Sequence, residues 1–393
     1  MPWKVSCPVS ERLQFVQRWQ DGERVTDLCR EFGISRKTAY KILGRFKEEG
    51  PRGLFDRSRE PRTTPNRTPV EIEEVVLALR RKHETWGPKK LFAWLADRRS
   101  DIKVPAAPTI QAILKRYNVP RRKQRPRRYR ALRGAPLQVA RQPNDIWCAD
   151  FKGQFKLGSG RYCYPLTITD RFSRFVIRCE ALESTHVETA RTVFEDAFKE
   201  YGLPRVIRTD NGVPFAGPGI WGLTTLSVRW MRLGIWPERI EPGHPEQNGQ
   251  HERMHLDLKR ETIRPAAANF LQQQQRFETF VETYNYERPH EALGQKPPAT
   301  VYCASSRQLP TKIVELEYPL HDTSLLVHQN GDVAFSRSER FTLSTVLAGE
   351  RVGLRELEPD RWLVSFIDHD IGHYDRKNRL FEPTNAILPR RSA

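Results

Sequence analysis

The chain has 393 residues, which is enough for roughly two to four domains that each bury a hydrophobic core. Lysine and arginine outnumber aspartate and glutamate by 66 to 48, and the net charge of +18 makes a polyanion, above all nucleic acid, the expected partner. No stretch of about 18 to 20 uncharged apolar residues occurs, and the first residues lack the apolar segment of a signal peptide. These features argue against a membrane or exported protein, so we expect a cytoplasmic one, nucleoid-associated when bound to DNA.

The six cysteines are scattered along the chain, and no Cys-x-x-Cys pair occurs among them. This spacing indicates neither a disulfide framework nor a structural zinc site. We therefore expect the cysteines to be reduced.

Residues 1–50 are predicted to form a DNA-binding domain of short helices. Apolar or small residues recur at helical spacing over residues 25–46, Gly33 permits the positive φ of a tight turn, and Ser35 can cap the helix that follows. This pattern resembles a helix-turn-helix, although an ordinary helical hairpin has the same apolar spacing. The basic outer face favours DNA binding, and the residues predicted to read the groove are Arg36, Lys37, Thr38, Tyr40 and Lys41.

Residues 65–120 also have apolar side chains at helical spacing, and we interpret them as a second module of the helix-turn-helix or winged-helix type. Residues 121–142 then form a basic linker. No acidic residue occurs between Ile102 and Asn144, and such a run should be extended, solvated and able to lie along phosphates. A solubilising tether is the alternative. The linker residues predicted to contact DNA are Arg121, Arg122, Lys123, Arg125, Arg127 and Arg128.

Residues 143–303 alternate β-type runs with amphipathic stretches, which is typical of an α/β domain. The first β-type run contains Asp150, a residue that is costly in a strand unless a cation or hydrogen-bond donors compensate its charge. Two further runs, residues 162–169 and 175–179, predict a three-stranded antiparallel meander, and an amphipathic helix follows over residues 187–201.

Two more carboxylates follow in this domain. Asp210 ends a predicted strand directly before a turn, a position where sites in α/β folds collect. Glu252 lies in a predicted helix over residues 247–262, where Lys259 shares its face and an apolar stripe lies opposite. Residues 308–385 form the last domain, in which short β-branched runs and a hairpin signal at Asn330-Gly331 predict a small β-barrel.

These motifs resemble a known family. A strand with Asp150, a strand ending in Asp210-Asn-Gly, and then His-Pro-x-x-Asn-Gly-x-x-Glu252-Arg are similar to the catalytic core of DDE transposases and retroviral-type integrases. The segment Tyr284-Asn-x-x-Arg-Pro-His resembles the closing part of bacterial insertion-sequence transposases. The similarity covers roughly residues 140–303.

The resemblance implies a ribonuclease-H-like fold with a mixed five-stranded sheet, and an enzyme of the polynucleotidyl transferase class. Asp150, Asp210 and Glu252 would be both the catalytic residues and the ligands of Mg²⁺ or Mn²⁺, held as two ions. The expected reaction is 3′-end cleavage at terminal inverted repeats, followed by strand transfer into target DNA by a homo-oligomer. Arg253 and Lys259 would hold DNA phosphates; otherwise they form a solvated helix face.

The sequence departs from the family twice. Asp210 and Glu252 are 42 positions apart, longer than usual, with the excess expected in residues 217–235, and the zinc module of retroviral integrases is absent. Asp170 is interpreted as a turn cap and His244 as a loop-ordering residue. His251 and His255 have the spacing of a zinc-binding pair, but we do not interpret them as one, because the motif assigns their helix to Glu252. A metal-dependent nuclease without strand transfer and a non-catalytic DNA-binding regulator remain alternatives.

Overall fold

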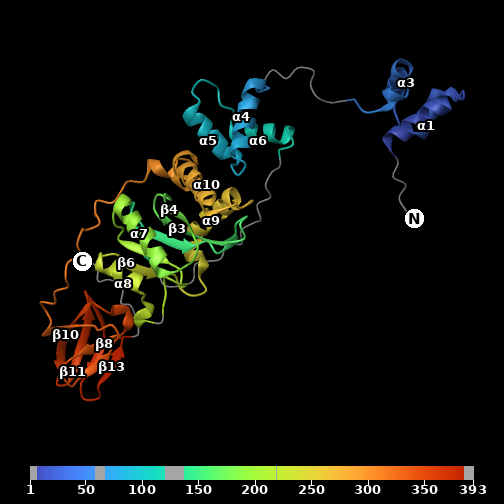
Figure 1. Cartoon of the computed structure of the whole chain (residues 1–393). Helices are drawn as coiled ribbons and strands as arrows, with labels where there is room; N and C mark the ends of the chain where they lie inside the picture. Colours follow the sequence, from blue (N-terminus) through green and yellow to red (C-terminus); the bar gives the residue numbers. More distant parts are fainter. Residues whose placement is uncertain (1–6, 58–66, 120–136, 218, 385–393) are drawn as a thin grey trace. The chain divides into compact units, whose positions relative to one another are not determined.

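The computed structural model describes residues 7–57, 67–119, 137–217 and 219–384 (Figure 1). The chain divides into two compact units, Met1–Thr68 and Pro69–Ala393. The linker residues predicted to contact DNA, numbers 121–128, lie outside the described residues. Within the described ranges, every helix is too short or too polar to cross a lipid bilayer.

The first unit contains three α-helices, α1 (Pro8–Gln20), α2 (Val25–Glu31) and α3 (Arg36–Glu49), and the 3₁₀ turn η1 (Gly50–Leu54). Gly33 has a φ of 64°, and the Ser35 side chain accepts a hydrogen bond of 3.2 Å from the Thr38 amide. The expected inter-helix turn and helix cap are therefore both present. The helices enclose a small core of Phe15, Val16, Leu28, Cys29, Ala39, Leu43 and Leu54.

A second helical module begins the other unit, with α4 (Val70–Lys82), α5 (Pro88–Arg98) and α6 (Ala107–Arg116). Trp86, Leu91 and Leu95 are among its fully buried apolar residues. Glu73 is the one buried carboxylate in the described part of this module. It accepts hydrogen bonds from the Arg116 guanidinium and from the Tyr117 hydroxyl. The helical prediction for this block is thus confirmed.

The central domain is built on a mixed sheet in the order β2-β3-β1-β5-β6, with β4 on β3. β1, β3 and β4 pair antiparallel, as the predicted meander requires, whereas β1, β5 and β6 pair parallel. The two-residue β2 pairs with the start of β3, so the sheet has six strands where five were expected. The strands are β1 (Ile146–Phe151), β2 (Phe155–Lys156), β3 (Tyr162–Asp170), β4 (Val176–Leu182), β5 (Val206–Thr209) and β6 (Trp236–Arg239).

Helices cover both faces of this sheet. On one face, α7 (Val187–Tyr201) and α8 (Thr225–Arg232) pack on the side chains of Trp147, Leu166 and Ile168. On the other face, α9 (Gly249–Thr262) and α10 (Phe270–Glu282) pack on β3 and β4. Because strand side chains alternate between faces, Asp150 points away from α7 and towards the α9 side. The short helices between these elements are η2 (Ile220–Gly222), η3 (Pro245–Asn248), η4 (Thr283–Glu287), η5 (Glu291–Leu293) and η6 (Pro298–Thr300).

The C-terminal strands form an open sheet in the order β13-β12-β11-β10-β7 and a separate hairpin, β8-β9. The predicted β-barrel is not confirmed, because the edge strands β7 and β13 do not pair and the sheets are not closed. The apolar face of the sheet is instead covered by the hairpin and by Leu223, Val228 and Met231 of the central domain. The elements are β7 (Thr323–Leu326), β8 (Asp332–Ala334), β9 (Arg340–Thr342), η7 (Thr345–Leu347), β10 (Arg351–Glu358), β11 (Arg361–Phe366), β12 (His369–Asp375) and β13 (Leu380–Pro383).

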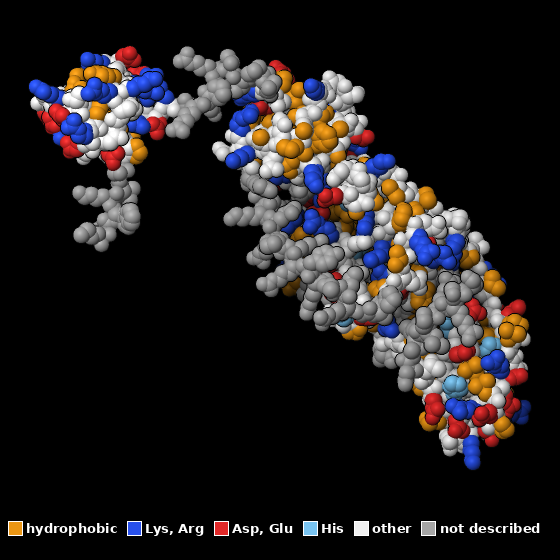
Figure 2. All heavy atoms as spheres, turned by 180° about the vertical axis from the view of Figure 1, so that it is seen from behind, with side chains coloured by type: hydrophobic (Ala, Val, Ile, Leu, Met, Phe, Trp, Pro, Cys, Tyr) orange, Lys and Arg blue, Asp and Glu red, His pale blue; other side chains and the backbone are white. Residues whose placement is uncertain are grey.

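Residues 217–235, which were predicted to account for the long interval between Asp210 and Glu252, contact the C-terminal domain. This segment contains η2 and α8, and Trp221 donates from its indole to the Thr384 carbonyl at 3.0 Å. Arg232 forms an ion pair of 3.1 Å with Glu350. This segment therefore joins the central domain to the C-terminal sheet, where acidic and basic side chains are intermingled on the surface (Figure 2).

Candidate active site

Two carboxylates from distant parts of the chain, Asp210 and Glu252, act electrostatically on Asp150. Burial raises the pKa of Asp150 to about 7, and the negative charges of Asp210 and Glu252 contribute to that rise. Lys152 opposes it. Since charge–charge effects fall off with distance, Asp210 and Glu252 lie within electrostatic range of Asp150.

Asp210 follows β5 directly and is held by its own turn. The Gly212 amide donates to the Asp210 Oδ1 at 3.1 Å, and a Cβ at position 212 would lie 3.1 Å from Oδ2. The Asn211 side chain donates to the Ile240 carbonyl at 2.7 Å, which ties this turn to the segment after β6. The Asp-Asn-Gly sequence thus orients the carboxylate and leaves room beside it.

Glu252 lies in the first turn of α9 and is exposed to solvent. Arg253 and Lys259 are also exposed, whereas Met254 and Leu258 are buried against the sheet. The helix therefore presents the two faces that its spacing predicts. On the exposed part of the helix, the cations Arg253 and Lys259 accompany Glu252, a combination suited to a metal ion and a phosphate backbone.

A buried network of threonine and histidine side chains lies beside Asp150. The Thr167 hydroxyl is 2.7 Å from His251 Nε2 and 2.6 Å from His255 Nε2, and it donates to the Asp150 carbonyl at 3.1 Å. The Thr169 hydroxyl is 2.8 Å from His251 Nδ1. Burial lowers the pKa of His251 to about 3 and holds that of His255 well below its usual range.

The sequence interpretation missed this network, although a signal for it was present. Thr167 and Thr169 alternate along β3 with the apolar Leu166 and Ile168, so polar residues occupy every second position of a strand. Such a polar stripe on a buried face requires polar partners from the covering helix. The two histidines of α9 supply them.

The segment resembling the end of insertion-sequence transposases acts as a support for the site. Asn285 accepts from the Val176 amide at 2.8 Å and donates to the Val176 carbonyl at 2.9 Å, which fixes the start of β4. Arg288, which is buried, donates to Asp257 at 2.6 Å and to Glu261 at 2.9 Å. These ion pairs hold the second half of α9, the helix that carries Glu252.

Two polar residues near the site, Asp170 and His244, form hydrogen bonds with neighbouring residues. Asp170 accepts from the Asn144 amide at 2.8 Å and from the Ser173 amide at 2.7 Å, so it caps a turn. His244 Nδ1 lies 2.8 Å from Glu246 Oε1 in the loop before α9. Both residues have the loop-ordering contacts that the sequence suggested.

The residues predicted to read a DNA groove lie together on α3. Tyr40 is 63% exposed, and Arg36, Lys37, Thr38 and Lys41 are exposed as well. The opposite side of the helix buries Ala39 and Leu43 in the core of the module, so this basic face is free to contact a ligand. Figure 2 shows Lys and Arg side chains at several points of this unit's surface.

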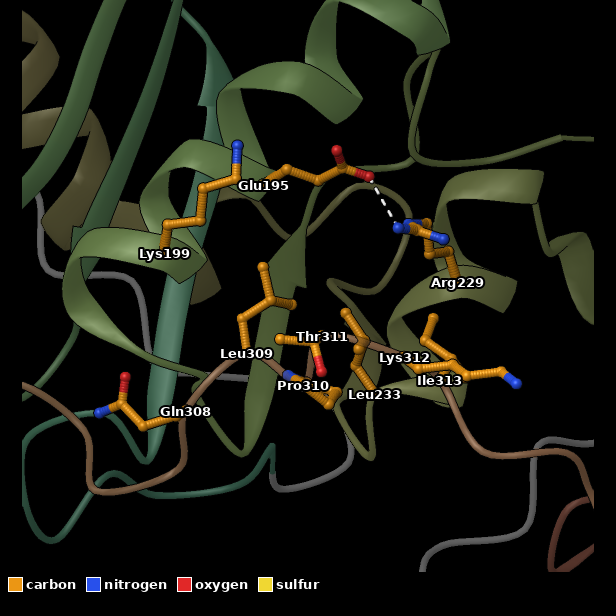
Figure 3. Close-up of a pocket in the computed structure, with 10 residues that line it drawn as sticks. All are labelled: Glu195, Lys199, Arg229, Leu233, Gln308, Leu309, Pro310, Thr311, Lys312 and Ile313. Atoms are coloured by element: carbon orange, nitrogen blue, oxygen red, sulfur yellow. Dashed lines mark ion pairs between the residues drawn. The ribbon is translucent and has the colours of Figure 1, made fainter.

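A hollow on the other side of the central domain is separate from the carboxylates. The Arg229 guanidinium pairs with Glu195 across it at 2.9 Å (Figure 3). It lies over α7 and α8, on the sheet face opposite Asp150. Its other lining residues are Lys199, Leu233, Gln308, Leu309, Pro310, Thr311, Lys312 and Ile313.

The carboxylate neighbourhood fits a divalent cation. Asp150, Asp210 and Glu252 offer hard oxygen donors, and a bound cation would offset the burial of Asp150 and the nearby negative charges, which together raise its pKa. Asp150, His251 and His255 also offer ligand atoms that all lie within 4.8 Å of one another. The structure therefore adds imidazole nitrogen to the donor set that the sequence indicated.

Comparisons with known proteins agree with the fold and motifs. Two family models are described as an integrase core domain. One matches residues 140–245, and the other matches residues 233–298. A helix-turn-helix domain model matches residues 11–62, and a homeodomain-like domain model matches residues 38–114.

Sequence relatives include an insertion element protein and retroviral polyproteins. The insertion element IS476 uncharacterized 39.2 kDa protein of Xanthomonas euvesicatoria is 28% identical over 165 residues, which is 42% of this chain and 45% of that protein. The Pol polyprotein of Feline endogenous virus ECE1 is 31% identical over 119 residues, 30% of this chain and 11% of the polyprotein. The chain thus spans less than half the length of either relative.

Among solved structures, the catalytic core domain of HTLV-2 integrase in complex with magnesium is 17% identical with a TM-score of 0.33, over 42% of this chain and 99% of that one. A chain of the simian T-cell lymphotropic virus intasome is 15% identical with a TM-score of 0.38, over 80% of this chain and 100% of that one. The family models therefore indicate an integrase core domain within residues 140–298, and over part of its length the chain is similar to an insertion element protein and to retroviral Pol polyproteins.

Proposed function

We propose that the chain is a transposase that cuts the 3′ ends of a DNA element and joins them to target DNA. The observation that carries this proposal is the match of integrase core domain models to residues 140–298, the range that contains Asp150, Asp210 and Glu252. A helix-turn-helix module with an exposed basic helix accompanies that core. This combination suits a reaction at sequence-marked ends of duplex DNA.

The three carboxylates would hold the metal, Mg²⁺ or Mn²⁺, as two ions. When bound, such ions activate the attacking water or 3′-hydroxyl and stabilise the leaving oxygen of a phosphoryl transfer. The chain's own task is to orient the carboxylates, through the Gly212 amide at Asp210 and the buried threonine–histidine network at Asp150. Arg253 and Lys259 would bind phosphates beside Glu252.

DNA would be held by several parts of the chain. The exposed residues of α3 would read the terminal inverted repeats, and the basic linker, residues 121–142, would follow the phosphate backbone. Residues 1–50, 65–120, 143–303 and 308–385 would be the functional domains on either side of it. A homo-oligomer is required because two element ends must be joined in one reaction.

The test uses the full chain, Mg²⁺ and a labelled element end. Nicked and then joined products support the proposal. Cleavage without joining supports a metal-dependent nuclease, and binding alone supports a regulator; either result overturns transposition.

The matching variant is Glu252→Gln, which should abolish cleavage and joining while end binding persists. Glu188→Gln is the control, because Glu188 is an exposed residue of α7 on the opposite sheet face. Unchanged joining by Glu252→Gln would contradict the site assignment.

A further inference from the structure

The hydroxyl of Thr167 is the centre of the buried network beside Asp150. Thr167 is the register partner of Asp150 across the β1–β3 pair, and its side chain is completely buried. It makes three hydrogen-bond contacts, to the Asp150 carbonyl and to the Nε2 atoms of His251 and His255. A hydroxyl has one proton to donate and two lone pairs to accept with, so three contacts use its full capacity.

This count determines the tautomers of both histidines. A carbonyl oxygen can only accept, so the single Thr167 proton must go to the Asp150 carbonyl. Both Nε2 atoms must then donate to Thr167. In a neutral imidazole with its proton on Nε2, the Nδ1 atom carries a lone pair.

The two Nδ1 lone pairs have different surroundings. That of His251 accepts from the Thr169 hydroxyl at 2.8 Å. The Nδ1 lone pair of His255 faces the Asp150 carboxylate, and the distance between His255 Nδ1 and Asp150 Oδ2 is 3.6 Å. His255 is only 4% exposed. Two electron-rich atoms that face each other in a buried site repel unless a cation or a proton lies between them.

We propose that His255 Nδ1 is a metal ligand and shares a divalent cation with Asp150. Two ligands about 2.1 Å from one metal ion lie roughly 3 to 3.4 Å apart, close to the observed separation. A mixed set of imidazole nitrogen and carboxylate oxygen favours a first-row transition ion such as Mn²⁺ over Mg²⁺. This inference rests on the proposed function only in taking Asp150 as a metal ligand.

The network also supplies the support that such a ligand needs. Metal-binding histidines usually donate their second ring N–H to an oxygen that fixes the ring orientation. Thr167 provides that oxygen for His255, and it binds the backbone of Asp150 at the same time. His251, one turn earlier on α9, has both nitrogens bound to threonine hydroxyls and is therefore not a ligand.

The experiment is pulsed electron paramagnetic resonance on the full chain titrated with Mn²⁺ alone. We expect ¹⁴N modulation from a directly bound imidazole in the wild type and its loss in His255→Gln, together with an Mn²⁺ affinity lower by about tenfold or more. Mg²⁺ affinity, measured by competition, should change less. His251→Asn is the matched control and should keep the ¹⁴N signal.

A second pair of variants separates ligation from folding. Thr167→Ser keeps the hydroxyl and should keep the ¹⁴N signal, whereas Thr167→Val should weaken it, with circular dichroism used to confirm that each variant is folded. Mn²⁺ binding that depends on Glu252 but shows no ¹⁴N signal would overturn this inference and leave the proposed function intact. Absence of Mn²⁺ binding to the wild type would overturn this inference, whereas the proposed function is tested separately by cleavage and joining with Mg²⁺.

Discussion

The two helical modules both have apolar residues at helical spacing but use their basic residues differently. Each has three helices around a small apolar core. In the first module the cations of α3 point to solvent. In the second module several cations contact the segment 286–291 of the central domain. A helical pattern with a basic face therefore does not by itself identify a DNA-reading surface.

The contacts of the second module are polar and numerous. Lys82 pairs with Glu287 at 3.3 Å, Lys89 pairs with Glu291 at 3.0 Å, and Arg98 donates to the Tyr286 carbonyl at 3.0 Å. The Thr85 hydroxyl donates to Glu261 at 2.5 Å, an acid that also accepts from Arg288. The second module is thus connected to α9 through one shared carboxylate.

The largest effect is expected from Arg288→Met. It leaves Asp257, which is 5% exposed, and Glu261 without their buried cation, which should lower the free energy of unfolding of the second unit by about 3 to 5 kcal/mol. Hydrogen exchange should quicken in α4 and α5, while α1 to α3 stay unchanged. Urea unfolding and exchange mass spectrometry measure the two effects.

Arg276→Met is the control for this change. Arg276 donates to the Pro265 carbonyl in an exposed position, so its loss should cost less than about 1 kcal/mol. Equal protection of α4 and α5 in wild type and Arg288→Met would show that the shared carboxylate does not couple the module to α9.

The second effect concerns DNA affinity. Replacing Arg36, Lys37 and Lys41 with alanine should weaken duplex binding, and each of these cations that neutralises a phosphate while the helix reads the groove should lower the slope of log K against log salt by roughly 0.9. Fluorescence anisotropy of a labelled duplex over a salt series measures it. The comparison variant replaces Lys82, Lys89 and Arg98, whose partners lie in the central domain, and its slope should stay near that of the wild type. Equal slopes in both variants would remove the distinction between the modules.

The smallest effect is the contribution of one histidine to the pH dependence of the second module. Among the described residues, the second module has one histidine, His83, which is stacked on Trp86. The described part of the first module has no histidine. Burial, followed by the nearby charge of Lys82, lowers the pKa of His83 to about 4. Below pH 6.5 the His83 imidazole is protonated in the unfolded chain but stays neutral in the folded module. The free energy of unfolding therefore decreases as the pH falls from 6.5 to 4.

At pH 5 this loss should be about 2 kcal/mol. Exchange mass spectrometry at pH 5 and 7, corrected for intrinsic rates, should show faster opening of α4 and α5 at the lower pH. His83→Phe keeps a ring on Trp86 and should reduce the difference by the His83 contribution, because the buried histidines of α9 remain. An equal acid effect in α1 to α3 would mean that another group is responsible.

Much of the fold could be predicted because its signals are local. Helical spacing, the turn at Gly33 and the Ser35 cap depend on residues within a few positions of each other, and the structure has all three. The C-terminal strands were also predicted, but their closure was not confirmed. Closure depends on whether β7 meets β13, and in the structure the apolar face is covered by residues of the α8 region instead.

The sequence by itself determined the helices, the strands and the order of three acids within them, since periodicity and turn chemistry act over short distances. Only the tertiary structure decided which side chains meet. Thr167 lies 88 positions from His255, and Asp257 lies 31 positions from Arg288, yet each pair is in hydrogen-bond contact. Such contacts require strand register, helix rotation and burial to agree at once, and no local pattern encodes that agreement.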